Sequence, residues 1–218
     1  MARLAKIKTM SELDIRDLGA DRDFREIWKL QEKMVQERRD GEIGDTILLL
    51  EHAPVYTIGR TRDQSSLRDS SHLPHPVVEI NRGGQGTFHG PGQLVGYAIL
   101  DLNQRVKDLH EHLRQIEEII ILALAEFKIS AERRKGLTGV WVNEGKIASL
   151  GVGVRSWVTL HGFALNVQDI SLTPFQSITP CGIDGVTMTS AEKEAGRPIS
   201  MSEMKSAITK ALRKIFGP

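Results

Sequence analysis

The sequence holds one cysteine, Cys181, which lies in the polar segment SITPCGIDG between Pro180 and Gly182. Free cysteine is usually a small buried hydrophobe, but this polar loop indicates an accessible thiol. A thiol becomes a nucleophile when a nearby cation or backbone amides lower its pKa from about 8.5. Because no second cysteine is present, an intramolecular disulfide is excluded, and the lone thiol is typical of a reducing compartment.

Three side chains could act with this thiol, namely His89, His161 and Lys146. Lys146 follows a tight turn and opens the otherwise apolar segment IASLGVGV. A solvated lysine at the tip of a hairpin fits the sequence at least as well as a catalytic lysine, so both interpretations stay open on the residues alone. None of the histidines has a metal-site spacing such as H-E-x-x-H, so no metal is expected.

Residues 81–102, NRGGQGTFHGPGQLVGYAILDL, begin with five glycines in twelve residues. Glycine at this density is costly unless the backbone bends unusually or lies close to a ligand. A Walker A loop is excluded because Gly145 and Lys146 are followed by isoleucine, and the dinucleotide fingerprint fails because His89 stands where its third glycine should be. A lone glycine pair would indicate only a tight turn with a structural histidine, whereas five glycines beside Arg82 and His89 favour a binding site.

These residues must be positioned by helices and strands, which the apolar periodicity and turn signals predict. We expect helices over 23–39 and 109–127, short strands over 46–52, 54–60, 77–80, 94–102 and 163–167, a loop over 62–76, and a β-hairpin of GVWV and IASLGVGV turning at 143–145. Two capping boxes, Thr189 with Glu192 and Ser200 with Glu203, predict a short helix and a terminal helix ending at Phe216.

The strands cluster through short turns, and long helices do not alternate with every strand. This pattern predicts an α+β fold with a mixed, largely antiparallel sheet flanked by helices, and argues against a doubly wound nucleotide fold. We expect residues 1–218 to form a single domain, with a small helical extension after about residue 187.

The charge and hydropathy of the sequence limit the kinds of partner that the protein could bind. The 218 residues carry 29 basic and 28 acidic side chains, a formal net charge of +1, which gives no sign of a surface for nucleic acid or membrane. No apolar run reaches the roughly 18 to 20 residues needed to span a bilayer, and the N-terminal MARLAKIKTMSELD lacks the features of a secretory signal. We therefore expect a cytoplasmic protein, with an organellar matrix as the second alternative.

The segment RGGQGTFHGPGQLV closely resembles the signature of the lipoyl(octanoyl) transferase family, R-G-G-x-x-T-aromatic-H-x-x-G-Q, at every position. LLLEHAPVYTIGR, GVWVNEGKIASLGVGV, HGFALNV and TPCGI also resemble segments of that family, in the family's order. The resemblance extends from Ile47 to Ile183 and implies the catalytic-domain fold of the biotin/lipoate ligase superfamily.

The resemblance also implies a reaction, in which an octanoyl group moves from octanoyl-acyl carrier protein to a lysine of a lipoyl domain in the first step of endogenous lipoate synthesis. Acceptors would be the lipoyl domains of 2-oxoacid dehydrogenase acyltransferase subunits and the glycine cleavage H protein. Cys181 would be the nucleophile and Lys146 the residue that activates it and moves protons. No cofactor is expected, because exchange between thioesters needs no ATP.

The same resemblance assigns the substrate-binding residues: Arg82, Gly83, Gly84, Gln85, Gly86, Thr87, Phe88, His89, Ser149, Leu150, Gly151, Gly162, Phe163 and Ala164. Small residues such as Gly151, Gly153 and Ala164 would leave room for an apolar acyl tunnel. Two rival functions remain. An ATP-dependent lipoate or biotin ligase would share the glycine loop and the lysine but would not require Cys181, and a non-enzymatic acyl-binding protein would carry an inert thiol.

Overall fold

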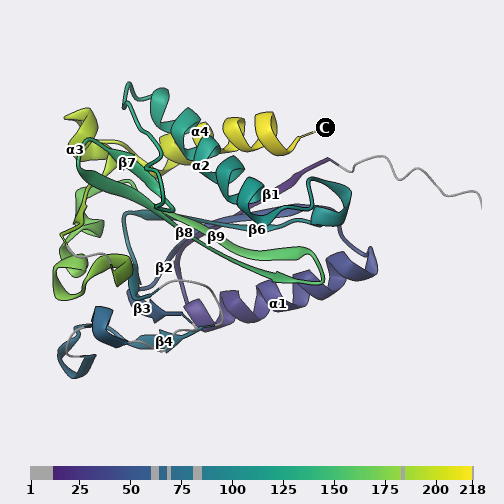
Figure 1. Ribbon diagram of the computed structural model, residues 1–218, viewed down its shortest axis with the longest axis horizontal. Coiled ribbons are helices and arrows are strands. Elements are labelled where there is room, and N and C mark those ends of the chain that lie inside the picture. Colours follow the sequence, from purple (N-terminus) through teal and green to yellow (C-terminus); the bar gives the residue numbers. More distant parts are fainter. Residues whose placement is uncertain (1–11, 60–63, 68–69, 81–84, 183–184, 218) are drawn as a thin grey trace, which may run out of the picture.

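The computed structural model describes residues 12–59, 64–67, 70–80, 85–182 and 185–217, which fold around two β-sheets (Figure 1). The seven-stranded sheet has the order β1-β2-β6-β9-β8-β10, with β7 also paired to β8, and the three-stranded sheet has the order β4-β3-β5. The strands are β1 (Asp14–Arg22), β2 (Thr46–His52), β3 (Val55–Ile58), β4 (Val77–Glu79), β5 (Thr87–His89), β6 (Gln93–Ile99), β7 (Val140–Val142), β8 (Gly145–Arg155), β9 (Val158–Asn166) and β10 (Thr187–Met188).

The larger sheet is mixed. β1 pairs with β2 and β10 pairs with β8 in parallel, whereas the other neighbouring strands of this sheet are antiparallel. The predicted α+β fold with a mixed, largely antiparallel sheet is therefore confirmed.

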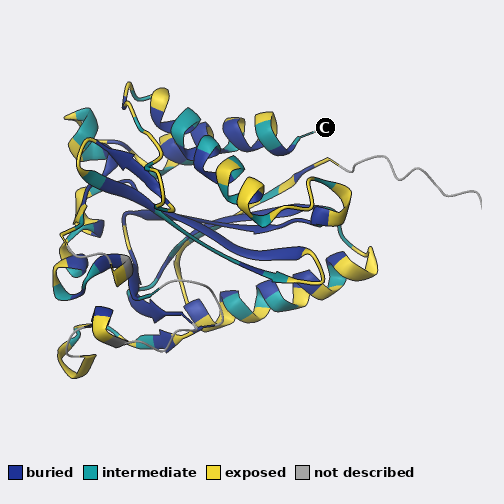
Figure 2. Cartoon of the chain, in the orientation of Figure 1, coloured by how far each residue is buried: buried dark blue, intermediate teal, exposed yellow. Residues whose placement is uncertain are grey.

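Helices cover both faces of this sheet, α2 (Leu109–Ala125) and α4 (Met201–Phe216) on one side and α1 (Phe24–Asp40) on the other (Figure 1). A short α3 (Ala191–Ala195) precedes α4. All nine residues of β9 are buried because both faces of the strand are covered, and the strands of the sheet's centre are dark in Figure 2. Two apolar clusters result, a larger one under α2 and α4 and a smaller one under α1.

The first helix begins and ends where the sequence predicts, to within one residue. Asp23 caps it by accepting hydrogen bonds from the backbone amides of Arg25 and Glu26. Gly41 ends it in the left-handed conformation, with φ of 78°, which glycine adopts without a steric penalty. This cap matters for the site because it places Phe24, the first helical residue, at the end of the helix nearest the small sheet.

The predicted hairpin at residues 143–145 is confirmed as β7 and β8, with Asn143 at a positive φ of 48°. A second hairpin joins β8 to β9 through Ser156 and Trp157, both at positive φ. The predicted strands 46–52 and 54–60 correspond to β2 and β3, but they lie in different sheets.

Two local expectations need correction. The cap of α3 is Ser190 rather than Thr189, since the Ser190 hydroxyl accepts from the amide of Lys193 while the Thr189 hydroxyl donates to Glu194. The expected loop over 62–76 contains two 3-10 helices, η1 (Gln64–Leu67) and η2 (Ser70–His72). The Ser200 and Glu203 capping box of α4 is confirmed.

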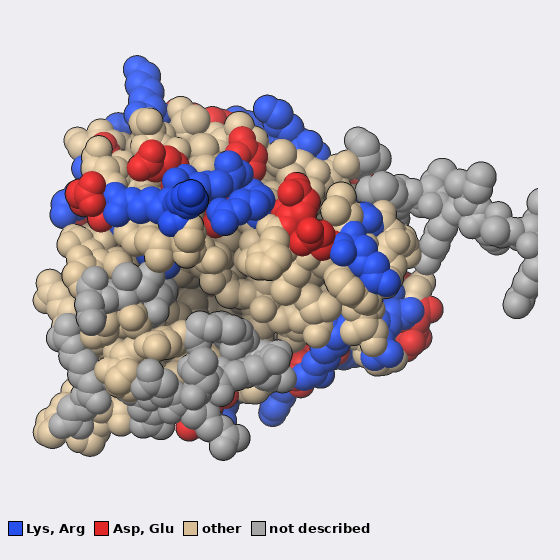
Figure 3. Space-filling model, viewed as in Figure 1, with Lys and Arg blue, Asp and Glu red and all other residues tan. Residues whose placement is uncertain are grey.

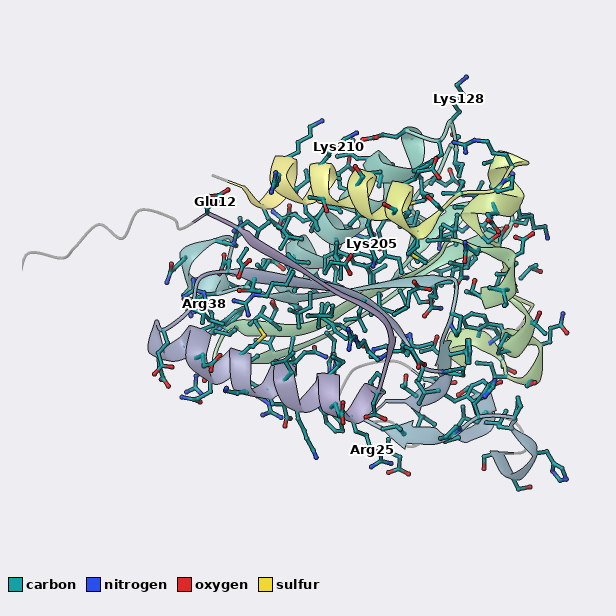
Figure 4. All side chains as sticks on the ribbon, turned by 180° about the vertical axis from the view of Figure 1, so that it is seen from behind. Glu12, Arg25, Arg38, Lys128, Lys205 and Lys210 are labelled. Atoms are coloured by element: carbon teal, nitrogen blue, oxygen red, sulfur yellow. The ribbon has the colours of Figure 1, made fainter. Side chains whose placement is uncertain are left out.

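The C-terminal helix α4 packs along α2, and its residues Met204, Ile208 and Leu212 belong to the larger apolar cluster. On its other side Lys205 reaches Asp17 of β1 at 2.7 Å, and the view from behind shows Lys205 over that strand (Figure 4). Within the described ranges, no helix combines the length and apolar character that a membrane crossing requires.

Candidate active site

A cavity of about 210 Å³ lies on the α1 side of the central sheet, between β6, β8 and β9, the start of α1, and β5 of the small sheet. Its lining residues are Phe24, Ile80, Gln85, Thr87, His89, Tyr97, Thr138, Lys146, Ser149, Leu150, Gly151, His161, Gly162, Phe163 and Ala164. Carbon atoms dominate its wall, so the cavity suits an apolar group with a few polar anchors. Figure 3 shows a hollow on the front face of the molecule, below a band of lysine and arginine side chains.

Strand register explains why small residues form the floor of the cavity. Gly162 of β9 lies between Gly151 of β8 and Tyr97 of β6, and Ala164 lies two residues further along, opposite Ser149. A side chain at Gly162 would overlap the backbone carbonyl of Gly96, so the close approach of β6 and β9 requires glycine there. At these two levels of the sheet, β8 and β9 therefore contribute only small residues to the floor.

Lys146 contributes a side-chain amino group to the cavity wall. It stands near the start of β8 and is only 2% exposed. Its Nζ lies 5.5 Å from the centre of the Trp141 ring, in the range of a cation–π contact. On another side, a Cβ built on Gly139 would lie 2.6 Å from Cε and 3.2 Å from Nζ of the lysine. Lys146 is thus an enclosed residue of the site, and the alternative of a solvated hairpin lysine is wrong.

His89 belongs to a buried hydrogen-bond chain that fixes its tautomer. The Gln93 amide nitrogen donates to the Phe88 carbonyl at 3.1 Å and to Asn166 Oδ1 at 3.0 Å, so its oxygen must face the imidazole. That oxygen lies 2.8 Å from His89 Nδ1, which therefore carries the proton. Asn166 in turn donates to the carbonyl of Thr189, the residue that follows β10, at 3.1 Å.

A second buried pair borders the cavity at Tyr97. His52 Nδ1 lies 2.9 Å from the Arg22 carbonyl and must donate to it, so the Tyr97 hydroxyl donates to His52 Nε2, 2.7 Å away. Burial lowers the pKa of His52 to about 4, outweighing the backbone hydrogen bond and the nearby Asp23 charge, which raise it. His52 is therefore a neutral structural acceptor that orients the tyrosine hydroxyl.

His161 enters the cavity wall through an unusual backbone conformation. Its φ is 63° in the middle of β9, although it is not glycine, and its ring lies edge-on to Tyr97 with centroids 6.1 Å apart. The backbone amide donates to Gln31 Oε1 of α1 at 2.8 Å, which holds the strained residue in place.

The segment that carries Cys181 packs beside the cavity. Cys181 lies in the 3-10 turn η6 (Pro180–Gly182), and its side chain is outside the part of the chain that the structure describes. Ser66 connects this segment to the glycine stretch, because its carbonyl accepts from the Thr179 amide at 2.7 Å and its hydroxyl accepts from the Gly86 amide at 2.8 Å. A side chain at Gly182 would overlap Gln85, which lines the cavity. The backbone of η6 therefore abuts the cavity wall.

Most of the substrate-binding residues assigned from the sequence line this one cavity: Gln85, Thr87, His89, Ser149, Leu150, Gly151, Gly162, Phe163 and Ala164. Gly86 and Phe88 are not among the lining residues, and the Phe88 ring packs instead against Tyr56 and Phe175 in the small sheet's own apolar cluster. Gly153, expected beside the acyl tunnel, faces the Leu160 side chain. Arg82, Gly83 and Gly84 lie outside the described residues. The binding roles of all these residues stay predictions.

Sequence reasoning missed Phe24, Ile80, Tyr97 and Thr138, which come from four separate elements or loops. The only signal for Tyr97 is the alternation of Gln93, Val95 and Tyr97 on one face of a strand. Across the described residues, no cluster of three or more histidine, cysteine or acidic side chains could hold a metal ion.

The chain is similar to known proteins in both sequence and fold. A sequence profile of the lipoyl protein ligase A/B catalytic domain matches residues 23–213. The chain is 50% identical to an octanoyltransferase of Geotalea uraniireducens, over 90% of this chain and 89% of the relative, and 50% identical to an octanoyltransferase of Geobacter sulfurreducens, over 90% and 81%.

Among solved structures, a bi-partite lipoate protein ligase of Thermoplasma acidophilum, studied together with its E2 lipoyl domain, superposes with a TM-score of 0.70 at 15% identity, over 94% of this chain and 84% of the other. At that identity the likeness shows the fold alone. The profile and the two close relatives show more: the chain belongs to the family of the lipoyl protein ligase A/B catalytic domain, and it is an acyltransferase of that family.

Proposed function

We propose that the chain transfers an octanoyl group from octanoyl-acyl carrier protein to a specific lysine of a lipoyl domain, through an acyl-thioester on Cys181. The observation that carries the proposal is the apolar cavity with buried Lys146 in its wall and the Cys181 turn against Gln85. The names of the close relatives support octanoyl as the acyl group. As expected from the sequence, acceptors would be the lipoyl domains of 2-oxoacid dehydrogenases and the glycine cleavage H protein; the E2 lipoyl domain named with the Thermoplasma ligase supports this class.

In the first half-reaction the Cys181 thiolate attacks the carbonyl carbon of the donor thioester. A C–S bond to Cys181 forms, the C–S bond to the carrier breaks, and the departing thiolate takes up a proton. Lys146, as an ammonium group, supplies that proton and leaves this step as a neutral amine. The exchange of one thioester for another is close to isoenergetic, which fits an enzyme without ATP.

In the second half-reaction the neutral amine of the acceptor lysine attacks the Cys181 thioester. A C–N bond forms, the C–S bond to Cys181 breaks, and Lys146 takes up the proton that the attacking amine loses. The product is an amide, so this step runs downhill and makes the transfer effectively irreversible. Lys146 then returns to the ammonium form that begins the cycle.

Each attack develops negative charge on the carbonyl oxygen, which needs a hydrogen-bond donor. The Gly86 and Gly182 amides do not suit this role because they already donate to Ser66 and Thr179. Thr87 suits it better: its hydroxyl is buried, the residue lines the cavity, and the hydroxyl has no hydrogen-bond partner among the described residues. We assign Thr87 Oγ1 as a donor to the oxyanion.

The proposal is tested by incubating the protein with octanoyl-acyl carrier protein and measuring its intact mass. We expect one octanoyl adduct, lost on treatment with hydroxylamine and absent from Cys181→Ser. A parallel incubation with free octanoate, ATP and a lipoyl domain tests the ligase alternative, since octanoylation there would replace the proposal by ATP-dependent activation. Alkylation tests the inert-thiol alternative, because Cys181 reacting with iodoacetamide at neutral pH no faster than free cysteine would support acyl binding without catalysis.

A further inference from the structure

Glu117 is a buried carboxylate that the reaction does not use. It lies on α2 with no exposed surface. Ionised side chains are costly to bury, and a buried ion pair is weak evidence for added stability. The contacts of its two oxygens therefore indicate what it does.

Both oxygens hold the segment that leads into β7. Oε2 accepts from Arg114 at 2.6 Å and from Arg133 at 3.2 Å, and Oε1 accepts from the backbone amide of Gly139 at 3.0 Å. Arg133 binds the same helix again through the Arg114 carbonyl at 2.9 Å and Glu118 at 2.7 Å. The arginines are partly exposed, whereas the amide of Gly139 is buried and depends on Glu117.

Gly139 is the residue that bounds the end of the Lys146 side chain. Its φ of 135° is a conformation that residues with a side chain rarely adopt, and a Cβ at this position would lie 2.6 Å from Lys146 Cε and 2.8 Å from the Ala148 carbonyl. The backbone there is thus in contact with the lysine, whose Nζ also lies 5.5 Å from the centre of the Trp141 ring. Thr138, the preceding residue, lines the cavity beside it.

We propose that Glu117 is a positioning residue for Lys146: it holds the Gly139 peptide against the end of the lysine side chain and so keeps Nζ directed at the cavity. The inference rests on the proposed function, because Lys146 must move protons for its position to matter. Displacement of a reacting group by about 1 Å can cost on the order of a hundredfold in rate, so releasing this peptide should be visible in turnover.

The test compares three variants by steady-state octanoyl transfer from octanoyl-acyl carrier protein to a lipoyl domain. Glu117→Leu removes the acceptor and leaves an apolar side chain of similar size, and we expect kcat to fall on the order of a hundredfold with KM nearly unchanged. Glu117→Gln keeps one side-chain oxygen. We expect this oxygen to accept from the Gly139 amide, because the partly exposed arginines can bind water instead, and we expect kcat to stay close to the wild-type value. Glu118→Gln, the neighbouring control, loses an Arg133 contact without touching Gly139 and should match the wild type.

Circular dichroism and thermal melting of each variant separate a folding defect from a positioning defect. Should Glu117→Leu fail to fold, Gly139→Ala takes its place, because it leaves Glu117 intact and pushes on the lysine directly; the same loss of kcat is expected. The inference is overturned if folded Glu117→Leu or folded Gly139→Ala has the wild-type kcat. It is also overturned if kcat falls equally in Glu117→Gln and Glu117→Leu.

Lys146→Ala, measured alongside, distinguishes this failure from failure of the proposed function. If Lys146→Ala turns over like the wild type, the proposed role of the lysine is wrong, whatever Glu117 does. If Lys146→Ala is inactive while folded Glu117→Leu is fully active, the proposed function stands and the positioning role of Glu117 is wrong.

Discussion

His112 makes the folded protein sensitive to acid, and replacing it should remove a defined part of that sensitivity. The side chain is 1% exposed between α2 and the end of α4, where it stacks on Phe216 with ring centroids 5.8 Å apart. Neither ring nitrogen has a hydrogen-bond partner among the described residues. Burial, and then the positive charge of Arg105, lower the pKa of His112 from 6.5 to about 4.

The direction and the size of this effect on the free energy of unfolding follow from proton linkage. The unfolded chain takes up a proton near pH 6.5 and the folded chain only near pH 4, so stability is complete above pH 6.5 and is lost as the pH falls. A shift of this size corresponds to roughly 3 kcal/mol in the limit, of which roughly 2 kcal/mol is lost by pH 5. His52, whose pKa is also about 4, adds a similar loss of its own.

Urea unfolding of the wild type and His112→Leu between pH 7 and pH 5 measures this loss. The wild type should lose roughly 2 kcal/mol more than the variant over that interval, while His52 contributes equally to both and cancels. His110→Ala is the matched control, because His110 is exposed on the same helix and its removal should leave the profile unchanged. Parallel stability profiles for wild type and His112→Leu would refute the reasoning.

Three further predictions concern the cavity. Lys146→Ala should retain the fold and lose turnover, as checked by circular dichroism and octanoyl transfer, and a wild-type pH dependence of Cys181 alkylation would count against its role in activating the thiol. Thr87→Val should lower kcat by on the order of a hundredfold without lowering the melting temperature, because the hydroxyl has no partner to lose among the described residues; an unchanged kcat contradicts its assignment as oxyanion donor. Tyr97→Phe should destabilise the protein by about 1–3 kcal/mol in urea unfolding, because His52 Nε2 loses its buried donor, and an unaltered stability would show that water replaces the hydroxyl.

The parts of the fold that follow a strong local signal could be predicted from the sequence. The first helix has both an apolar stripe and two caps, Asp23 and Gly41, and its limits were found to within one residue. β1 has no such signal: it is an edge strand whose residues are mostly exposed, so its sequence DIRDLGADR shows no apolar alternation. β5 was not predicted because its three residues lie inside a glycine-rich stretch that indicates a loop.

Site residues that belong to a sequence motif could be predicted, whereas residues that reach the site only through strand pairing or helix packing could not. Thr87 and His89 were found from their motif, and they line the cavity. Tyr97 was missed because it joins the site only through the pairing of β6 with Gly162 on β9. In the sequence Glu117 is one of several polar residues of α2, and its contact with Gly139 depends on how this helix packs against the segment before β7.

The central claim is that acyl transfer passes through Cys181, and the intact mass of the protein during turnover tests it most directly. Wild type mixed with octanoyl-acyl carrier protein should gain one octanoyl group that hydroxylamine removes and that disappears when a lipoyl domain is added, while the lipoyl domain gains the same mass. Cys181→Ser should show neither change. Octanoylation of the lipoyl domain by Cys181→Ser at the wild-type rate would contradict the account.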